Sequence, residues 1–260
     1  MNKKKVIILF VLCTSFYMKA SMIVHYEFNT GTGTIAFDSS GNGFDATISG
    51  ATWTTDRFGN NNSAINTGQN KYVDPPNAPL KPAICTLAAW IYIEGYDSSA
   101  APIFSAEKGW GASGFAYRLQ ITPAGNLRME AIAPYSTSPA RVVTSSEALD
   151  THQWCHVAGT YDGTNTSIYI NGKITGTVSA VSYAALNTDS TIPVGIGHLD
   201  GWSVQWFRGN IDDARIYDEA LSEAEIAAIV AIPEPILISF LFVGTIWLGA
   251  LQRQQIRKQK

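Results

Sequence analysis

The amino-acid sequence predicts an all-β protein, an antiparallel two-sheet sandwich with a short C-terminal helix and a separate transmembrane tail. The first observation is composition, because 22 glycines, 11% aromatic residues and many Thr, Ser and Asn residues suit short strands joined by tight turns. The second is a hairpin pattern over residues 154–173, where apolar and polar side chains alternate and Asn171-Gly172 tolerates the positive φ angles of a type I′ turn. A chain of 260 residues suits one such domain with accessory segments.

The first 20 residues have the pattern of a secretory signal peptide. Three lysines at positions 3–5 precede an apolar run over residues 6–13, and Ala20 is the candidate last residue before cleavage. We therefore expect residues 1–20 to direct export across the inner membrane and then to be removed.

Strand-like runs separated by turn clusters fill the body of the chain, residues 21–231. Four prolines between positions 75 and 82 interrupt regular pairing, because each lacks a backbone N–H. The longest apolar run, 84–93, is expected at the centre of a sheet. The other expected strands are 25–28, 46–53, 62–65, 103–105, 115–121, 127–132, 141–144, 191–197 and 205–217.

A helical signature follows the last expected strand. Ser222 and Glu225 form a capping box, in which the Ser oxygen accepts from the backbone N–H of Glu225 and the carboxylate reaches back. Ile226, Ile229 and Val230 then fall on one helix face. The sequence predicts a short helix that packs on the sandwich.

Several motifs of the body resemble one known family. Trp-x-His-Val-Ala-Gly-Thr-Tyr-Asp-Gly at 154–163 and Tyr-Ile-Asn-Gly-Lys at 169–173 resemble the central hairpin of concanavalin A-like, laminin G-like jelly rolls, specifically a bacterial group found in secreted glycan-handling proteins. Residues 26–43 resemble the opening strand and loop of that family, residues 86–91 a central core strand, and residues 209–222 the closing strand. The resemblance covers about 23–230 and implies a jelly roll whose closing strand pairs beside the first.

The C-terminal segment, residues 232–260, differs in character from the body. Pro233-Glu234-Pro235 precedes an uncharged apolar run, 236–251, and a basic end. At 1.5 Å per residue this run would make a helix of about 24 Å, slightly short of the ~30 Å hydrocarbon core. Its basic end should stay cytoplasmic. The pattern resembles the PEP-CTERM sorting signal of Gram-negative bacteria that make extracellular polysaccharide, which implies processing by an exosortase. The alternative is a plain membrane anchor.

Composition and motifs limit the chemistry of the protein. The formal net charge of −3, without a basic patch, argues against nucleic acid as a partner. Glycosidases of the jelly-roll family carry paired carboxylates in a Glu-x-Asp-x-x-Glu strand, which this chain lacks, and Glu130 stands alone in its strand. On a strand, His152 and His156 share one face and Cys155 points to the other, so the three cannot bind one zinc ion. We therefore expect no catalytic residues.

Two cysteines, Cys85 and Cys155, lie in the body of a chain expected to be exported. Export permits a disulfide between them. The sequence does not show whether their Cα atoms lie within the ~7 Å that a bridge requires, so free buried thiols stay the alternative.

A calcium site is implied by the resemblance. Hard oxygen donors cluster at Asp38, Asn42 and Asp45, and Asp212 lies in the expected closing strand. Ca²⁺ prefers such oxygen ligands, and similar sandwiches often hold a structural calcium with groups from these two regions. The alternative is that Asp38 and Asn42 make Asx turns with their own backbone.

Aromatic residues in loops are the candidate ligand-binding residues. Trp110 and Trp202 follow glycines and Tyr135 lies in a Pro/Ser loop, and flat rings of this kind can stack on sugars while polar neighbours bond hydroxyls. The alternative is packing of these loops against the sandwich. The tryptophans assigned to the core or its rim are Trp90, Trp154 and Trp206.

These observations predict an exported, surface-associated, non-catalytic protein that binds a glycan, such as exopolysaccharide, or another matrix component. Before exosortase processing, its C-terminal helix would hold it in the membrane with the body outside the inner membrane. Afterwards it would lie at the cell surface or in the medium. A protein-binding adhesion module on the same fold is the main alternative, and a degenerate glycoside hydrolase is the third.

Overall fold

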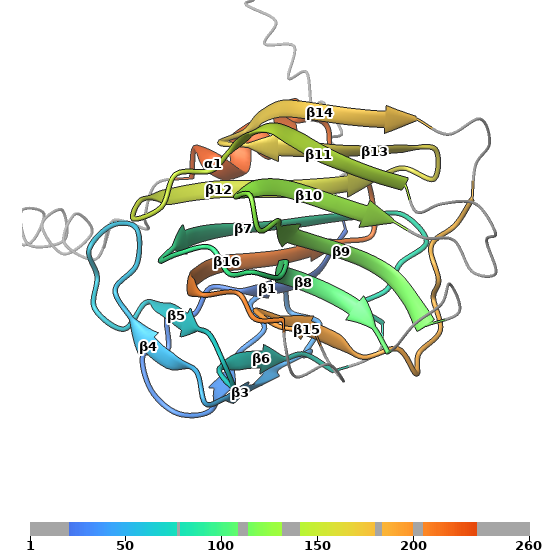
Figure 1. Cartoon of the computed structure of the whole chain (residues 1–260). Helices are drawn as coiled ribbons and strands as arrows, with labels where there is room; N and C mark the ends of the chain where they lie inside the picture. Colours follow the sequence, from blue (N-terminus) through green and yellow to red (C-terminus); the bar gives the residue numbers. More distant parts are fainter. Residues whose placement is uncertain are drawn as a thin grey trace, which may run out of the picture.

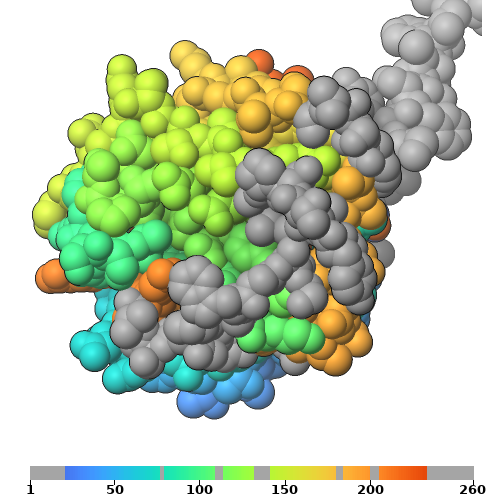
Figure 2. Space-filling model, turned by 45° about the vertical axis from the view of Figure 1, so that its right-hand side comes forward, coloured from blue at the N-terminus to red at the C-terminus, as the bar shows by residue number. Residues whose placement is uncertain are grey.

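The computed structural model describes residues 21–76, 79–108, 114–131, 141–179, 184–199 and 205–232. They form two packed sheets and one helix, as Figure 1 shows. Figure 2 shows one compact body, with the blue N-terminal residues at the bottom and yellow residues toward the top. The named strands pair antiparallel throughout the described chain, so the prediction of an antiparallel two-sheet sandwich is confirmed.

One sheet, called sheet A here, contains the predicted centre of the fold. Its strands are β1 (Met22–Tyr26), β4 (Thr52–Thr54), β5 (Ala64–Thr67), β7 (Cys85–Ile93), β12 (Trp154–Tyr161), β13 (Asn165–Ile170), β14 (Lys173–Ser179) and β16 (Gly209–Tyr217). Their order is β14–β13–β12–β7–β16–β5–β4, and β1 pairs with β16. The long apolar strand β7 is therefore central, and the closing strand pairs beside the first, as the resemblance implied.

The other sheet, sheet B, covers one face of sheet A. Its strands are β2 (Ile35–Ala36), β3 (Ala46–Ser49), β6 (Tyr72–Asp74), β8 (Ala101–Glu107), β9 (Phe115–Ile121), β10 (Asn126–Ala131), β11 (Arg141–Ala148) and β15 (Val194–Ile196). Their order is β11–β10–β9–β8–β15–β6–β3–β2. The last strands of the two sheets, β11 and β14, lie side by side at the top of Figure 1.

The core lies between the sheets, and strand alternation decides which side chains enter it. In β7, Leu87, Ala89 and Ile91 are fully buried against sheet B. Because successive strand side chains point to opposite faces, Trp90 and Tyr92 lie on the outer face of sheet A, the face turned away from sheet B. This outer face positions the polar groups described below.

The predicted helix is α1 (Glu223–Val230), and it packs on the outer face of sheet A. Ser222 and Glu225 form the predicted capping box. Ile226 and Ile229 are buried with Tyr169 and neighbouring side chains of the sheet. The helix therefore covers the part of the outer face near β12 and β13.

The structure corrects one expected strand of the body and decides between the two alternatives for the cysteines. The expected strand 46–53 is two strands in different sheets, because Gly50 adopts φ +66° and turns the chain from sheet B to sheet A. Cys85 and Cys155 are free, buried thiols. Cys85 pairs in register with Tyr161 and Cys155 with Ile91, so the two cysteines lie at opposite ends of the β7–β12 pair.

The terminal predictions concern parts of the chain that the structure does not describe. The expected signal peptide, 1–20, the expected transmembrane run, 236–251, and the sorting motif Pro233-Glu234-Pro235 lie outside the described residues. Within 21–232, apart from the gaps given above, no helix is long and apolar enough to cross a membrane.

Candidate functional site

The predicted ligand-binding residues, Trp110, Trp202 and Tyr135, lie outside the described residues. They stay predictions. The candidate site therefore has to be found among the polar groups that the described strands bring together.

The loop proposed for calcium uses its oxygens in hydrogen bonds. Asp38 accepts from the backbone N–H groups of His25 and Phe44, both at 3.0 Å, and from the backbone and hydroxyl of Ser40. Although burial raises the pKa of Asp38, these hydrogen bonds lower it below the ordinary value. Asp45 accepts from the backbone N–H of Asp38 at 2.8 Å. The bond from the Ser40 N–H is the Asx turn of the alternative interpretation, which the structure shows for Asp38.

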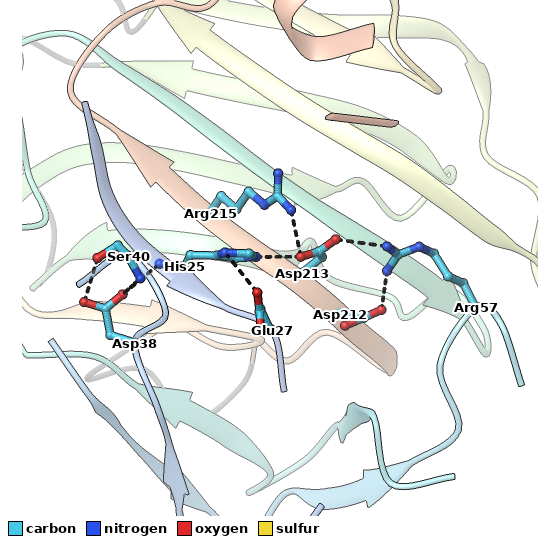
Figure 3. Close-up of polar contacts among 8 residues, drawn as sticks. All are labelled: His25, Glu27, Asp38, Ser40, Arg57, Asp212, Asp213 and Arg215. Carbon is cyan, nitrogen blue, oxygen red and sulfur yellow. Dashed lines mark hydrogen bonds and ion pairs between the residues drawn. The ribbon is translucent and has the colours of Figure 1, made fainter. Parts of the chain in front are cut away.

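The fourth proposed calcium ligand, Asp212, lies elsewhere. Figure 3 shows Asp38 at one end of the drawn residues and Asp212 near the other, with His25 between them. Asn42 donates from its amide to the carbonyls of residues 22 and 23. No group of three or more His, Cys, Asp or Glu side chains in the described chain is arranged to hold a metal ion. The four residues do not fit one calcium ion, and calcium binding stays a prediction.

Asp212 and Asp213 belong instead to an ionic cluster with His25, Arg57 and Arg215 (Figure 3). Asp213 contacts His25 Nε2 at 2.6 Å and accepts from Arg57 and Arg215, both at 3.0 Å. Arg57 also donates to Asp212 at 2.5 Å. Asp213 adopts φ +55° in a bulge of β16, which lets two consecutive carboxylates reach the same arginine.

The two carboxylates of the ionic cluster have pKa values shifted in opposite directions. Burial and the charge of Asp213 raise the pKa of Asp212 to about 7, against the attraction of Arg57. Burial also acts on Asp213, but the His25 hydrogen bond and the charges of Arg215 and Arg57 outweigh it and hold the pKa of Asp213 well below its ordinary value. Asp213 is therefore the ionised partner of the surrounding cations.

Next to this cluster, His156 and Trp90 are packed edge to face with ring centroids 5.5 Å apart. His156 is 1% exposed, and neither of its ring nitrogens has a hydrogen-bond partner within the described chain. Burial and the positive charges of Arg215 and Arg57 lower the pKa of His156 to about 3. His156 is therefore neutral in the folded protein near pH 7.

A second feature is a cleft of about 630 Å³, called the loop-end cleft here. It lies where the turn after β5, the loop after β7 and the segment before β16 meet. Its lining includes Asn66, Lys71, Glu94, Trp206 and Arg208. Charges of both signs and an aromatic ring thus face one cavity.

The side chains of the loop-end cleft are held in place by contacts behind them. Trp206 stacks on Tyr72 at 5.4 Å and on His198 at 5.9 Å between ring centroids. Asn66 donates to Glu94 at 2.9 Å. Such a cleft can stack a flat ligand on the indole, donate hydrogen bonds from Arg208 or Lys71, and accept them at Glu94.

Sequence reasoning missed this site. Trp206 was assigned to the core or its rim, and the structure places it at the rim, where it lines the loop-end cleft. The available signal was a basic residue, Arg208, two positions after Trp206 at the start of the last expected strand.

Several solved structures have a fold similar to that of this chain, among them an arabinanase domain, a sialidase and a toxin binding domain. Domain 4 of AbnA, a GH43 extracellular arabinanase from Geobacillus stearothermophilus in complex with arabinotriose, matches at 20% identity and a TM-score of 0.62, over 81% of this chain and 98% of that chain. Trypanosoma rangeli sialidase in complex with the inhibitor DANA matches at 16% identity and 0.59, over 82% and 33%. The binding domain of botulinum neurotoxin DC in complex with rat synaptotagmin II matches at 15% and 0.59, over 81% and 51%.

The chain thus spans about half or less of the sialidase and toxin chains. The comparison with curated proteins gave no match. A family model described as the concanavalin A-like lectin/glucanases superfamily matches residues 66–227, which is more than half of the chain. The protein belongs to the concanavalin A-like lectin/glucanases superfamily.

Proposed function

We propose that the protein is an exported, non-catalytic carbohydrate-binding protein that holds a glycan in the loop-end cleft. The observation that carries this proposal is the cleft itself. Its volume of about 630 Å³ falls within the roughly 300–1,000 Å³ of small-ligand sites. Trp206 offers a flat face for sugar C–H groups, and Arg208 and Glu94 offer a donor and an acceptor for hydroxyls.

The structural relatives support the ligand class. The arabinanase domain was solved with arabinotriose, and it matches this chain over nearly its whole length. The sialidase has been solved with sialic acid, but the match covers 32% of that chain, so this ligand is not assigned to the matched part. Because these likenesses are below 25% identity, they support the class of ligand and not a particular sugar.

The absence of catalysis is proposed from the missing Glu-x-Asp-x-x-Glu strand and from the pairing of three acids outside the loop-end cleft. Glycoside hydrolysis needs two accessible carboxyl groups, one acidic and one ionised. Asp212 and Asp213 are such a pair, because the pKa is raised in Asp212 and lowered in Asp213. Their side chains, however, are only 4% and 10% exposed, and both pair with Arg57. Glu130 accepts from Gln120 at 2.9 Å and lies 3.7 Å from Arg118. These pairings support a structural role for all three acids.

A protein-binding adhesion module is the second candidate. The toxin binding domain was solved in complex with a protein, synaptotagmin II. Ile35 and Phe37, 46% and 53% exposed, lie in and beside the edge strand β2 and offer an apolar surface. If this second candidate is right, the protein binds no sugar, and Phe37→Ala abolishes binding of the protein partner.

The test is titration of the protein with a panel of arabino-, xylo-, cello- and chito-oligosaccharides and sialyllactose. We expect one class to bind, with a loss of roughly tenfold or more on Trp206→Ala. Arg208→Ala should also weaken binding, whereas Phe37→Ala is a matched control that should not. Loss of binding on Trp110→Ala or Trp202→Ala with Trp206→Ala unaffected would move the site to the loops predicted from sequence. No binding to any glycan would reject the proposal.

Export and sorting are proposed from the terminal segments alone. Removal of residues 1–20 and a cut near Pro233-Glu234-Pro235 would release the sandwich from the membrane. Mass spectrometry of the mature protein from a host with and without an exosortase tests this. An intact C-terminus in both hosts would favour the plain membrane anchor.

A further inference from the structure

A histidine paired with an aspartate lies behind Trp206 of the loop-end cleft. His198 Nε2 lies 3.0 Å from Asp74 Oδ1. Because a carboxylate only accepts hydrogen bonds, Nε2 is the ring nitrogen that carries the hydrogen. His198 is 3% exposed, and neither His198 nor Asp74 belongs to the lining of the cleft. Any effect of this pair on a glycan in the cleft therefore has to pass through a neighbouring side chain.

A stack of three rings connects the pair to the cleft. The His198 ring stacks on Tyr72 with the centroids 4.0 Å apart, and Tyr72 stacks on Trp206 at 5.4 Å. The planes of the three rings differ by at most 27°. Stacking keeps the rings nearly parallel, but it leaves each ring free to slide or turn in its own plane. The hydrogen bond from Nε2 to Asp74 removes this freedom from His198.

The backbone brings the same rings together. His198 and Trp206 form an antiparallel bridge, so their side chains project to the same face. The Ser105 hydroxyl donates to the His198 carbonyl at 2.7 Å. A Cβ atom at Gly195 would lie 2.7 Å from His198 Nε2, so the glycine leaves room for the imidazole. The position of His198 is thus fixed at its backbone as well as at its ring.

We propose that Asp74 and His198 are positioning residues for glycan binding, which fix the plane of the Trp206 indole through Tyr72 without touching the glycan. This inference rests on the proposed function. A side chain that is already held in its bound orientation loses less conformational freedom when a ligand arrives, and this raises affinity without a new contact. Support of this kind from behind the contacting residues is what a precise binding site needs.

The experiment measures the dissociation constant for the arabino-, xylo-, cello- or chito-oligosaccharide, or sialyllactose, that the wild type binds most tightly. Asp74→Ala should weaken binding roughly fivefold. The Asp74 side chain is 39% exposed, so this variant should keep the fold. Asp74→Asn should stay within about twofold of the wild type, because the amide oxygen still accepts from Nε2. His198→Phe keeps a flat ring but loses the hydrogen bond, and it should match Asp74→Ala.

Two further readings separate positioning from a loss of stability. Because Asp74→Ala and His198→Phe remove the same hydrogen bond, the double variant should lose no more affinity than either single variant. Acrylamide quenching of the Trp206 fluorescence, obtained as the difference from Trp206→Phe, should rise in Asp74→Ala and not in Asp74→Asn. Asp218→Ala is the matched control and should change neither reading, because Asp218 is an exposed acid that follows the end of β16 away from the cleft.

The outcomes distinguish this inference from the proposed function. If Trp206→Ala weakens binding while Asp74→Ala and His198→Phe leave both the dissociation constant and the quenching unchanged, the positioning role is rejected and the proposed function stands. Lower melting temperatures of these two variants with unchanged affinity would also reject the positioning role, because they would show a structural role alone. If no glycan of the panel binds the wild type, both are rejected.

Discussion

Asp213 is the residue on which the ionic cluster depends. It contacts His25, Arg57 and Arg215, which come from β1, the loop after β4 and β16. One buried carboxylate therefore joins the N-terminal strand, a distant loop and the closing strand. Asp212 contacts Arg57 alone among these groups and has a pKa raised to about 7.

The first prediction is an asymmetry between two neighbouring substitutions. Asp213→Asn should lower the free energy of unfolding by about 3–5 kcal/mol, since it leaves the buried Arg215 without its counter-ion. Asp212→Asn should cost only about 1 kcal/mol, because the amide resembles the protonated acid that burial favours. Urea unfolding at pH 7 measures both. Equal losses would contradict the assignment of the charge to Asp213.

The second prediction is a pH dependence due to His156. The pKa of His156 is lowered from 6.5 to about 3 in the folded protein. Below pH 6.5 the unfolded chain therefore binds a proton at this histidine that the folded protein does not bind. By pH 5 this should lower stability by about 2 kcal/mol.

The raised pKa of Asp212 acts in the opposite direction over the same window, because the fold binds that proton more tightly than the unfolded chain. The measurement is therefore the free energy of unfolding at pH 7 and at pH 5, compared between the wild type and His156→Gln. The variant should lose less stability than the wild type on acidification. Parallel curves would show that His156 does not stay neutral in the fold.

At the scale of single elements, the approach of β16 to β7 depends on Gly209. Gly209 has φ +155°, and a Cβ atom there would lie 2.0 Å from the carbonyl oxygen of Tyr92. Gly209→Ala should therefore destabilise the protein by about 3 kcal/mol, because backbone cannot move aside as a flexible side chain can. Thermal unfolding measures this. Gly68→Ala is the matched control, since nothing lies within 4 Å of its Cβ position. Equal stability of both variants would contradict the close approach.

Local elements were the part that the sequence could predict. The Asn171-Gly172 turn has φ angles of +50° and +80°, and the Ser222 capping box forms as expected, since each depends on residues a few positions apart. The division of the run 46–53 into β3 and β4 was missed, because alternation continues through Gly50 and only the partner strands reveal the change of sheet.

The sites were less predictable, since they join distant parts of the chain. Asp212 was interpreted as a calcium ligand, but its partner is Arg57, 155 positions earlier. The loop-end cleft combines Asn66 of β5, Glu94 after β7 and Trp206 before β16. A single sequence shows which residues lie in loops, but not which loops meet.

At the scale of the whole molecule, the sandwich is held together by the apolar core between its sheets, by hydrogen bonds and by the ionic cluster. The calcium prediction can be tested directly on this account. The melting temperature should be the same with calcium and with a chelator, because Asp38 already accepts four hydrogen bonds and Asp212 pairs with Arg57. A rise of several degrees with calcium would show that the ion displaces these partners.

The most direct test of the central claim is a crystal structure of the protein with the oligosaccharide that binds best in the panel. The proposal predicts a sugar ring stacked on Trp206, with hydroxyls bonded to Arg208 and Glu94. A sugar bound on sheet B, or at any place that leaves the loop-end cleft empty, would contradict the proposal.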